Sequence, residues 1–246
     1  MKLRSVCMFC MVGLLVVSSS WSRGHEQYSC SAELGKAVEL YQKGRFSKAI
    51  LALNEIKMQC GGGPVIDSVL YYIGMCNMGQ KKYPEARAAF QDLARDYPNS
   101  PLSEEAQFRI GVSVYSESSA YYRDQKETKD AILLFKDFLA NYPKSQMADS
   151  VSKYLEEAVD KLAKKEFENA LFYEKNRQPE SAAVYYKAFI NEFPDSKYTT
   201  DAKFNMCKIL INQNRAGEAK EILENLAQST DSGIAARAKQ MLKQIK

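Results

Sequence analysis

The chain has 246 residues, of which 46% are apolar and 26% are charged, with 12 glycines and 7 prolines. This composition is ordinary for a soluble protein and excludes collagen-like and intrinsically disordered chains. The formal net charge of +4 is small. We therefore expect no nucleic-acid partner, because such partners require basic residues gathered on one face.

The N-terminus has the pattern of a secretory signal peptide. Lys2 and Arg4 precede an apolar run from Val6 to Val17, and small serines follow it. This order predicts a signal peptide over residues 1–22, with cleavage after Ser22, and a short segment over residues 23–30. The apolar run is too short for a membrane-spanning helix. We expect an exported protein that is soluble after processing.

Six cysteines divide between the signal and the mature chain. Cys7 and Cys10 lie inside the predicted signal, and Cys30 is the first cysteine after it. Cys30 lies well beyond the apolar run and lacks the small residues that precede a lipidated cysteine. We therefore expect no lipid anchor. The four remaining cysteines would be in an oxidising compartment, where they can pair.

An internal repeat begins in the first third of the chain. A shift of 37 residues places Gly74 on Gly111, and an aromatic-Pro-x-Ser turn recurs further along. Gly74 is followed by Ala86, Phe90 and Pro98, which is the order of a tetratricopeptide repeat. Small residues let two helices approach, the aromatic ring fills the space between repeats, and the proline ends the second helix.

The pattern of the second helix recurs along the chain. Its copies are Ala49/Leu53/Ile56, Ala86/Phe90/Leu93, Ala131/Phe135/Phe138, Ala182/Tyr186/Phe189 and Ala219/Leu223/Leu226. An amphipathic segment from Ile234 to Ile245 follows as a cap for the last apolar face. The sequence thus predicts an all-α fold, a right-handed α-solenoid of about five tetratricopeptide helix pairs and a C-terminal capping helix. Repeats one to three would occupy residues 31–145, and repeats four and five with the cap residues 146–246.

Two repeats are longer than the others. The intervals from Pro98 to Pro143 and from Pro143 to Pro194 are 45 and 51 residues, against about 34 in a typical repeat. We expect the first helices of repeats three and four to run several turns beyond their partners. Two roles stay open for the extra turns, a packing spacer or a protruding surface for a partner protein. At the start of repeat three, Ser103 is the expected N-cap.

The cysteines of the repeats have two expected roles. Cys30 lies just before the first predicted helix and Cys60 just after the second, and these points are neighbours in an antiparallel helix pair. A Cys30–Cys60 disulfide and two free thiols both remain possible, since sequence gives no distance. Cys76 and Cys207 fall on first helices, where we expect them to be buried as small hydrophobic residues.

The first helices of a tetratricopeptide array line a concave groove. Nine apolar candidates for this groove are Leu34, Val38, Tyr41, Tyr71, Met75, Met78, Phe108, Val112 and Tyr115. Each of them has packing against a neighbouring repeat as an alternative role. As a set, they indicate a groove for an extended peptide with aromatic side chains. Leu34 and Val38 stand where carboxylate-clamping grooves use Lys, Arg or Asn, and so argue against such a clamp.

Catalytic motifs are absent from the sequence. The only histidine is His25, beside the predicted cleavage site, so no Ser/His/Asp or Cys/His set can form. Metal-ligand spacing is missing. The glutamate pairs 104–105 and 156–157 have the pattern of ordinary solvated helix faces. We expect a protein that is no enzyme and has no metal, cofactor or small-molecule substrate.

Three segments, residues 121–151, 162–175 and 181–196, resemble the BamD family, the tetratricopeptide component of the outer-membrane β-barrel assembly complex. The most specific pieces are Asp124-Gln125, Thr128, and Lys165-Glu166-Phe167 before Ala170. The resemblance covers roughly residues 31–228. It implies a non-enzymatic scaffold on the periplasmic side of the outer membrane. It also implies that C-terminal repeats dock the periplasmic domains of the barrel-inserting subunit and that N-terminal repeats receive the aromatic-ended signal of unfolded barrel proteins.

The N-terminus departs from this family. Most members carry a lipobox cysteine directly after the apolar run, and none is recognisable here. Contact with the membrane is then expected through protein partners. The alternative function is a soluble periplasmic tetratricopeptide adaptor, similar to the coordinator protein of the Tol-Pal system.

Overall fold

The computed structural model describes residues 28–245. The signal peptide predicted over residues 1–22, the cysteines within it and His25 lie outside the described residues.

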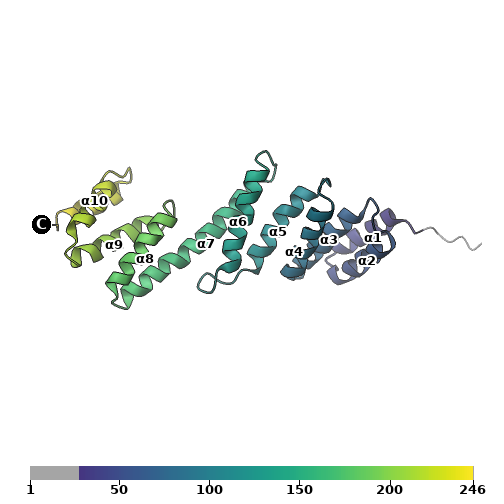
Figure 1. Ribbon diagram of the computed structural model, residues 1–246, viewed down its shortest axis with the longest axis horizontal. Coiled ribbons are helices and arrows are strands. Elements are labelled where there is room, and N and C mark those ends of the chain that lie inside the picture. The colour runs from purple at the N-terminus through teal and green to yellow at the C-terminus, as the bar shows by residue number, and fades with distance from the viewer. Residues whose placement is uncertain (1–27, 246) are drawn as a thin grey trace, which may run out of the picture.

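All regular elements of residues 28–245 are helices, and each packs chiefly against its neighbours in chain order. The eleven helices are α1 (Cys30–Gln42), α2 (Phe46–Gln59), α3 (Ile66–Gly79), α4 (Tyr83–Asp96), α5 (Ser103–Glu117), α6 (Lys126–Asn141), α7 (Ala148–Lys175), α8 (Pro179–Glu192), α9 (Thr199–Asn212), α10 (Ala216–Ala227) and α11 (Ser232–Leu242). They form an elongated array from α1 to α10, with α7 crossing obliquely between α6 and α8 (Figure 1). The predicted tetratricopeptide solenoid of five helix pairs with α11 as its cap is confirmed; its handedness stays a prediction.

Close approach of the two helices in a repeat depends on glycine in the first helix. A Cβ atom on Gly74 would lie 2.5 Å from the ring of Phe90, and one on Gly111 would lie 2.6 Å from the ring of Phe135. The two rings are almost fully buried. The small residue and the aromatic residue of the repeat therefore pack directly on each other, which is the contact that the sequence pattern predicts.

The aromatic-Pro-x-Ser turn is a joint between repeats. The Ser100 hydroxyl accepts a hydrogen bond from the backbone N–H of Leu102 at 3.1 Å and donates to the Asp67 carboxylate at 2.6 Å. Asp67 lies in the first turn of α3, in the preceding repeat. The serine thus holds the start of α5 and links it to the previous first helix.

The joint before α7 repeats this arrangement. Ser145 accepts from the N–H of Met147 at 3.0 Å and donates to the Glu104 carboxylate.

The prediction that Ser103 caps α5 is wrong, because Ser103 is the first residue inside the helix, is buried and makes no capping bond. Leu102 is the N-cap residue and no side chain caps α5; the turn serine Ser100 instead binds the N–H of Leu102, just before the helix.

Only one of the two long repeats has a long first helix. Helix α7 has 28 residues against 14 in α8, as predicted for repeat four. For repeat three the prediction is wrong, since α5 has 15 residues and its partner α6 has 16. The extra residues 118–125 form an irregular loop, because the side chain of Gln125 binds backbone carbonyls that a helix would otherwise satisfy.

The hydrophobic core runs along the array in three clusters. One spans α1–α5, a second joins α5, α6 and α7, and a third extends from α6 to α11. Within the described range, none of the helices is both long enough and apolar enough to cross a membrane.

Candidate functional site

The first two repeats carry a row of aromatic rings. The ring centroids of Tyr41 and Tyr72 are 5.4 Å apart, as are those of Tyr72 and Tyr71, and both pairs meet edge to face. All three tyrosines are partly buried. The row therefore joins α1 to α3 while leaving part of each ring in contact with solvent.

A cavity of about 370 Å³ lies beside this row. Its apolar lining comes from Tyr41, Phe46, Met75 and Met78, and glycines 44 and 79 shape its edge. Methionine is flexible and polarizable, so such walls adapt to aromatic side chains of different shape. Burial raises the pKa of the Tyr41 hydroxyl, which therefore stays protonated at neutral pH.

The other predicted groove residues are distributed differently. Leu34 and Val38 are partly buried on α1, on the same helix as Tyr41. Tyr115 lies further along, with its ring 6.2 Å from that of Tyr154 and the Lys161 ammonium 5.3 Å from its centroid. Burial raises the pKa of Tyr115. The cavity itself is thus formed by the first two repeats.

The structure corrects the prediction that Phe108 and Val112 face the groove, because both side chains are buried. They are only 6% and 4% exposed, respectively. The Phe108 ring lies 6.1 Å from that of Phe138 and 5.6 Å from that of Tyr154. Helix α7 covers this part of α5, so that the two side chains belong to the core and offer no surface to a ligand.

Three polar side chains meet beside the aromatic row. The Tyr71 hydroxyl donates to a Glu105 carboxylate oxygen at 2.7 Å, and Nε and Nη2 of Arg109 donate to the same oxygen at 3.2 and 2.9 Å. Burial, and then the bond to Glu105, raises the pKa of Tyr71. Burial, the largest single influence, would lower the pKa of Arg109, but the interactions with Glu105 and Tyr71 together outweigh it and the pKa is raised. The guanidinium therefore stays charged.

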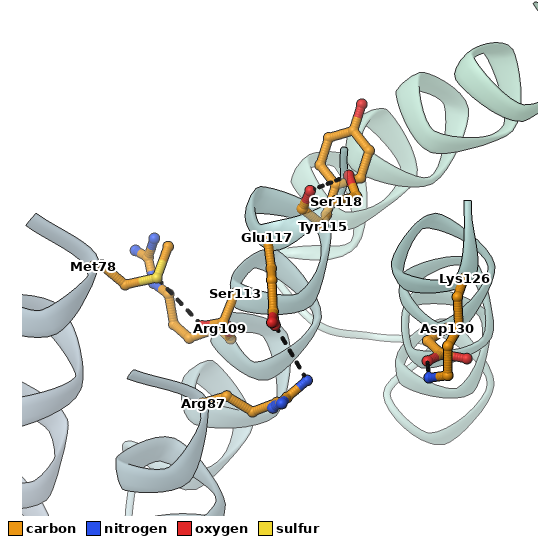
Figure 2. A network of polar contacts seen from close by, with 9 residues as sticks. All are labelled: Met78, Arg87, Arg109, Ser113, Tyr115, Glu117, Ser118, Lys126 and Asp130. Carbon is orange, nitrogen blue, oxygen red and sulfur yellow. Dashed lines mark hydrogen bonds and ion pairs between the residues drawn. The ribbon is translucent and has the colours of Figure 1, made fainter. Parts of the chain in front are cut away.

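Arg109 lies directly beside the methionine wall. The Ser113 hydroxyl is 2.7 Å from the carbonyl oxygen of Arg109 and 3.3 Å from the sulfur of Met78 (Figure 2). Figure 2 shows the Arg109 side chain next to Met78, between α3 and α5. This places one positive charge and one negative charge at the edge of an otherwise apolar site.

Sequence reasoning missed this polar group. It treated Glu105 as part of a solvated helix face, whereas the carboxylate is half-buried and shared between two partners. The available signal was the spacing of four residues between Glu105 and Arg109, which places opposite charges on one helix face. That signal is common on helices and does not indicate a site by itself.

The cysteines have structural positions. Cys30 and Cys60 form a disulfide with Cα atoms 6.2 Å apart, which closes the outermost helix pair. Cys76 and Cys207 are free and fully buried, as predicted. Burial raises the pKa of each free thiol to about 11, so both are protonated and unreactive at neutral pH.

Across the part of the chain that the structure describes, His, Cys, Asp and Glu form no group of three or more that could hold a metal ion. The cavity beside Tyr41 instead offers apolar walls and aromatic edges, and the Glu105–Arg109 ion pair lies nearby, beside the aromatic row. These features suit the binding of an extended protein segment.

The chain is also similar in sequence to known proteins. The family model of YfiO, described as an outer membrane lipoprotein, matches residues 29–220. The chain is 22% identical over 178 residues to the outer membrane protein assembly factor BamD of Caulobacter vibrioides. This alignment covers 72% of this chain and 58% of that protein. It is 23% identical over 218 residues to BamD of Haemophilus influenzae, covering 83% of this chain and 82% of the relative. A putative BamD of Aquifex aeolicus is 27% identical over 251 aligned residues, covering 96% of this chain and 76% of the relative.

Two solved tetratricopeptide structures also align with most of the chain. A thermophilic tetratricopeptide protein of Thermus thermophilus has a TM-score of 0.38 at 15% identity and covers 87% of this chain and 99% of its own. The TPR2AB domain of yeast Sti1 has a TM-score of 0.42 at 13% identity and covers 87% of this chain and 97% of its own.

Proposed function

Because the chain belongs to the YfiO family of outer membrane lipoproteins and is a BamD-like tetratricopeptide protein, we propose that it is a non-catalytic scaffold for the assembly of β-barrel proteins in the outer membrane. In this proposal it works at the periplasmic face of that membrane and reaches the membrane through its partners. It binds proteins and needs no cofactor or small-molecule substrate.

The N-terminal half, residues 31–145, receives aromatic-ended segments of unfolded outer-membrane proteins. The cavity between Tyr41, Met75 and Met78 supports this role, because an aromatic side chain would meet aromatic edges and thioethers there. Nε and Nη2 of Arg109 bind Glu105, which leaves Nη1 to donate to a carbonyl of the incoming chain.

The C-terminal half, residues 146–246, docks the barrel-inserting subunit. Helix α7 extends the surface of repeat four well beyond an ordinary repeat. Phe172 on α7 and Val184 on α8 are 60% and 66% exposed. Exposed apolar residues of this kind are typical of protein interfaces when they gather on one surface.

The observation that carries the proposal is the aromatic and methionine cavity in a chain of this family. Its test is the binding of a fluorescent peptide that ends in phenylalanine, followed by anisotropy. Met75→Glu should weaken binding by about tenfold or more, because it places a charge against apolar walls. Met58→Glu is the matched control, since Met58 is 78% exposed on α2 and lies outside the cavity. Equal binding by the two variants would contradict the peptide role.

Partners are tested in intact envelopes. Affinity purification of the full chain should recover subunits of the β-barrel assembly machinery. Recovery of Tol-Pal proteins without any of those subunits would instead favour the adaptor that is similar to the Tol-Pal coordinator. Mass spectrometry of the mature N-terminus would show whether the chain carries a lipid.

A further inference from the structure

Two methionines form much of the wall of the cavity beside Tyr41. Met75 and Met78 are partly buried on α3, and both border the cavity of about 370 Å³. The following repeat has Val112 and Tyr115 at the equivalent positions. A repeat of this kind therefore packs with other apolar side chains at these places, and the two thioethers are a particular feature of this cavity.

The two thioethers are also accessible to small molecules. Met206 and Met241 are only 8% and 9% exposed and belong to the C-terminal core cluster. Met75 and Met78 are less buried and adjoin a cavity that is open to solvent. A small oxidant therefore reaches the side chains of Met75 and Met78 more readily than those of the two core methionines.

A sulfoxide in this wall would change what the cavity binds. Oxidation converts a flexible apolar side chain into a polar one with a strong hydrogen-bond acceptor. The Ser113 hydroxyl lies 3.3 Å from the Met78 sulfur, but its single proton has the Arg109 carbonyl oxygen, at 2.7 Å, as the closer acceptor. An aromatic side chain that entered the cavity would displace water from the sulfoxide oxygens and offer them no donor in return.

Met78 in addition connects the cavity to the polar group of α5. It packs against the core cluster of α1–α5 and against the cluster that joins α5, α6 and α7. Figure 2 shows Arg109 beside it, and the proposed function assigns this guanidinium to a carbonyl of the incoming chain. An oxygen atom on the Met78 sulfur would compete for the same donor. Oxidation of Met78 would thus affect both the wall of the cavity and its nearest cation.

The reaction needs only a peroxide as co-reactant. The lone pair of the thioether sulfur attacks one oxygen atom of hydrogen peroxide, so that an S–O bond forms and the O–O bond breaks. The second oxygen leaves as water with both protons. Sulfur loses two electrons and the peroxide gains them. The free thiols of Cys76 and Cys207 are fully buried and so do not compete for the oxidant.

We propose that Met75 and Met78 form a modification site, at which a peroxide oxidises both thioethers to sulfoxides and thereby weakens the binding of apolar segments in the cavity. The inference rests on the proposed function, because it describes how binding at that same cavity is regulated. The proposed location at the periplasmic face is an oxidising compartment. The modification is reversible, since methionine sulfoxide reductases restore the thioether.

The test uses the full processed chain, hydrogen peroxide and the fluorescent peptide that ends in phenylalanine. Mass spectrometry of proteolytic peptides measures the sulfoxide at each methionine, and anisotropy measures the Kd of the same samples. Met75 and Met78 should be oxidised before Met206 and Met241, and the Kd should then rise about tenfold. Treatment with reductases for both sulfoxide epimers should return the Kd to its original value.

Leucine variants distinguish this site from other methionines. Each protein is compared with its own untreated sample, so that any effect of leucine on the starting affinity cancels. Peroxide should leave the Kd of Met75→Leu/Met78→Leu unchanged, because leucine keeps an apolar wall that peroxide does not oxidise. Met58→Leu, at a position of α2 that is 78% exposed, should lose affinity on treatment as the wild type does.

Several outcomes would overturn the inference while the peptide role stands. These are an unchanged Kd after oxidation of Met75 and Met78, an equal loss of affinity in Met75→Leu/Met78→Leu, or two thioethers that stay reduced when Met58 is fully oxidised. A loss of helical circular dichroism together with binding would also overturn it, since the cause would then be unfolding. If the untreated wild-type chain does not bind the peptide, the peptide role fails and the inference fails with it.

Discussion

Gly74 of α3 lies against the ring of Phe90 of α4 so closely that a Cβ atom on the glycine would be 2.5 Å from the ring. Gly35 of α1 is the opposite case, since a Cβ atom there would meet nothing within 4 Å. The two glycines are both helical, but only one of them is required by packing.

Alanine at these two positions should therefore change stability in opposite directions. Gly74→Ala should lower the free energy of unfolding by about 1–3 kcal/mol, because a buried ring must shift. Gly35→Ala should raise it by about 0.5–1 kcal/mol through the better helix propensity of alanine. Urea unfolding of the two variants measures both changes. A loss of stability in Gly35→Ala equal to that in Gly74→Ala would contradict the packing role of Gly74.

The Tyr71 hydroxyl should contribute to stability through Glu105. Tyr71→Phe removes a hydrogen bond to a half-buried carboxylate, and we expect a loss of about 1–2 kcal/mol in the free energy of unfolding. Tyr72→Phe is the matched control, since the neighbouring ring packs at the same distance from its aromatic partner. Similar urea midpoints for the two variants would show that the bond to Glu105 adds little.

Gln125 should govern the rigidity of the loop over residues 118–125. Gln125→Glu has the same shape but turns a donor into an oxygen that faces carbonyl oxygens. We expect faster amide hydrogen exchange over residues 118–124 and little change in the remote helices α1–α4. Gln107→Glu, at an exposed position on α5, should leave exchange in the loop unchanged. A loop that exchanges equally slowly in Gln125→Glu would contradict the role of the amide.

The disulfide should stabilise the N-terminal repeat. Cys30 and Cys60 are separated by 30 residues, and a loop of this length corresponds to about 3.5 kcal/mol in the chain-entropy description. Cys30→Ser/Cys60→Ser should unfold at lower urea, and a reductant should lower the wild-type midpoint to a similar value. Cys76→Ala/Cys207→Ala should keep its sensitivity to reductant. If that variant lost the sensitivity, the stabilising bond would have to lie elsewhere.

The buried thiols should make stability fall at alkaline pH. Burial raises the pKa of Cys76 from 9.0 to about 11, so the folded chain keeps a proton that the unfolded chain releases between these values. The contribution is complete below about pH 9 and is lost as the pH rises through 11. In a Cys207→Ala background, adding Cys76→Ala should flatten the free energy of unfolding between pH 8.5 and about 10.5. Equal slopes in the two backgrounds would show that Cys76 releases its proton equally in both states.

Local patterns of the sequence were sufficient for the repeat architecture. The order of Gly74, Ala86 and Phe90 specifies a helix pair, and the recurrence of this order specifies the array, because helical period and turn residues act over short distances. The burial of Cys76 and Cys207 followed from the same register. The length of α7 followed from a stretch without glycine or proline.

The surface of the groove depended on contacts between repeats. Val112 and Met75 occupy equivalent positions in their repeats, yet Val112 is buried in the core whereas Met75 borders a cavity. Residues 118–125 were expected to continue a helix. They form an irregular loop instead, in which the Gln125 side chain donates to three backbone carbonyl oxygens. Sequence alone determined the helix pairs and their order, with the exception of this loop. Only the tertiary structure decided which apolar faces stay open, since the exposure of a side chain depends on helices that are distant in the chain and fold across it.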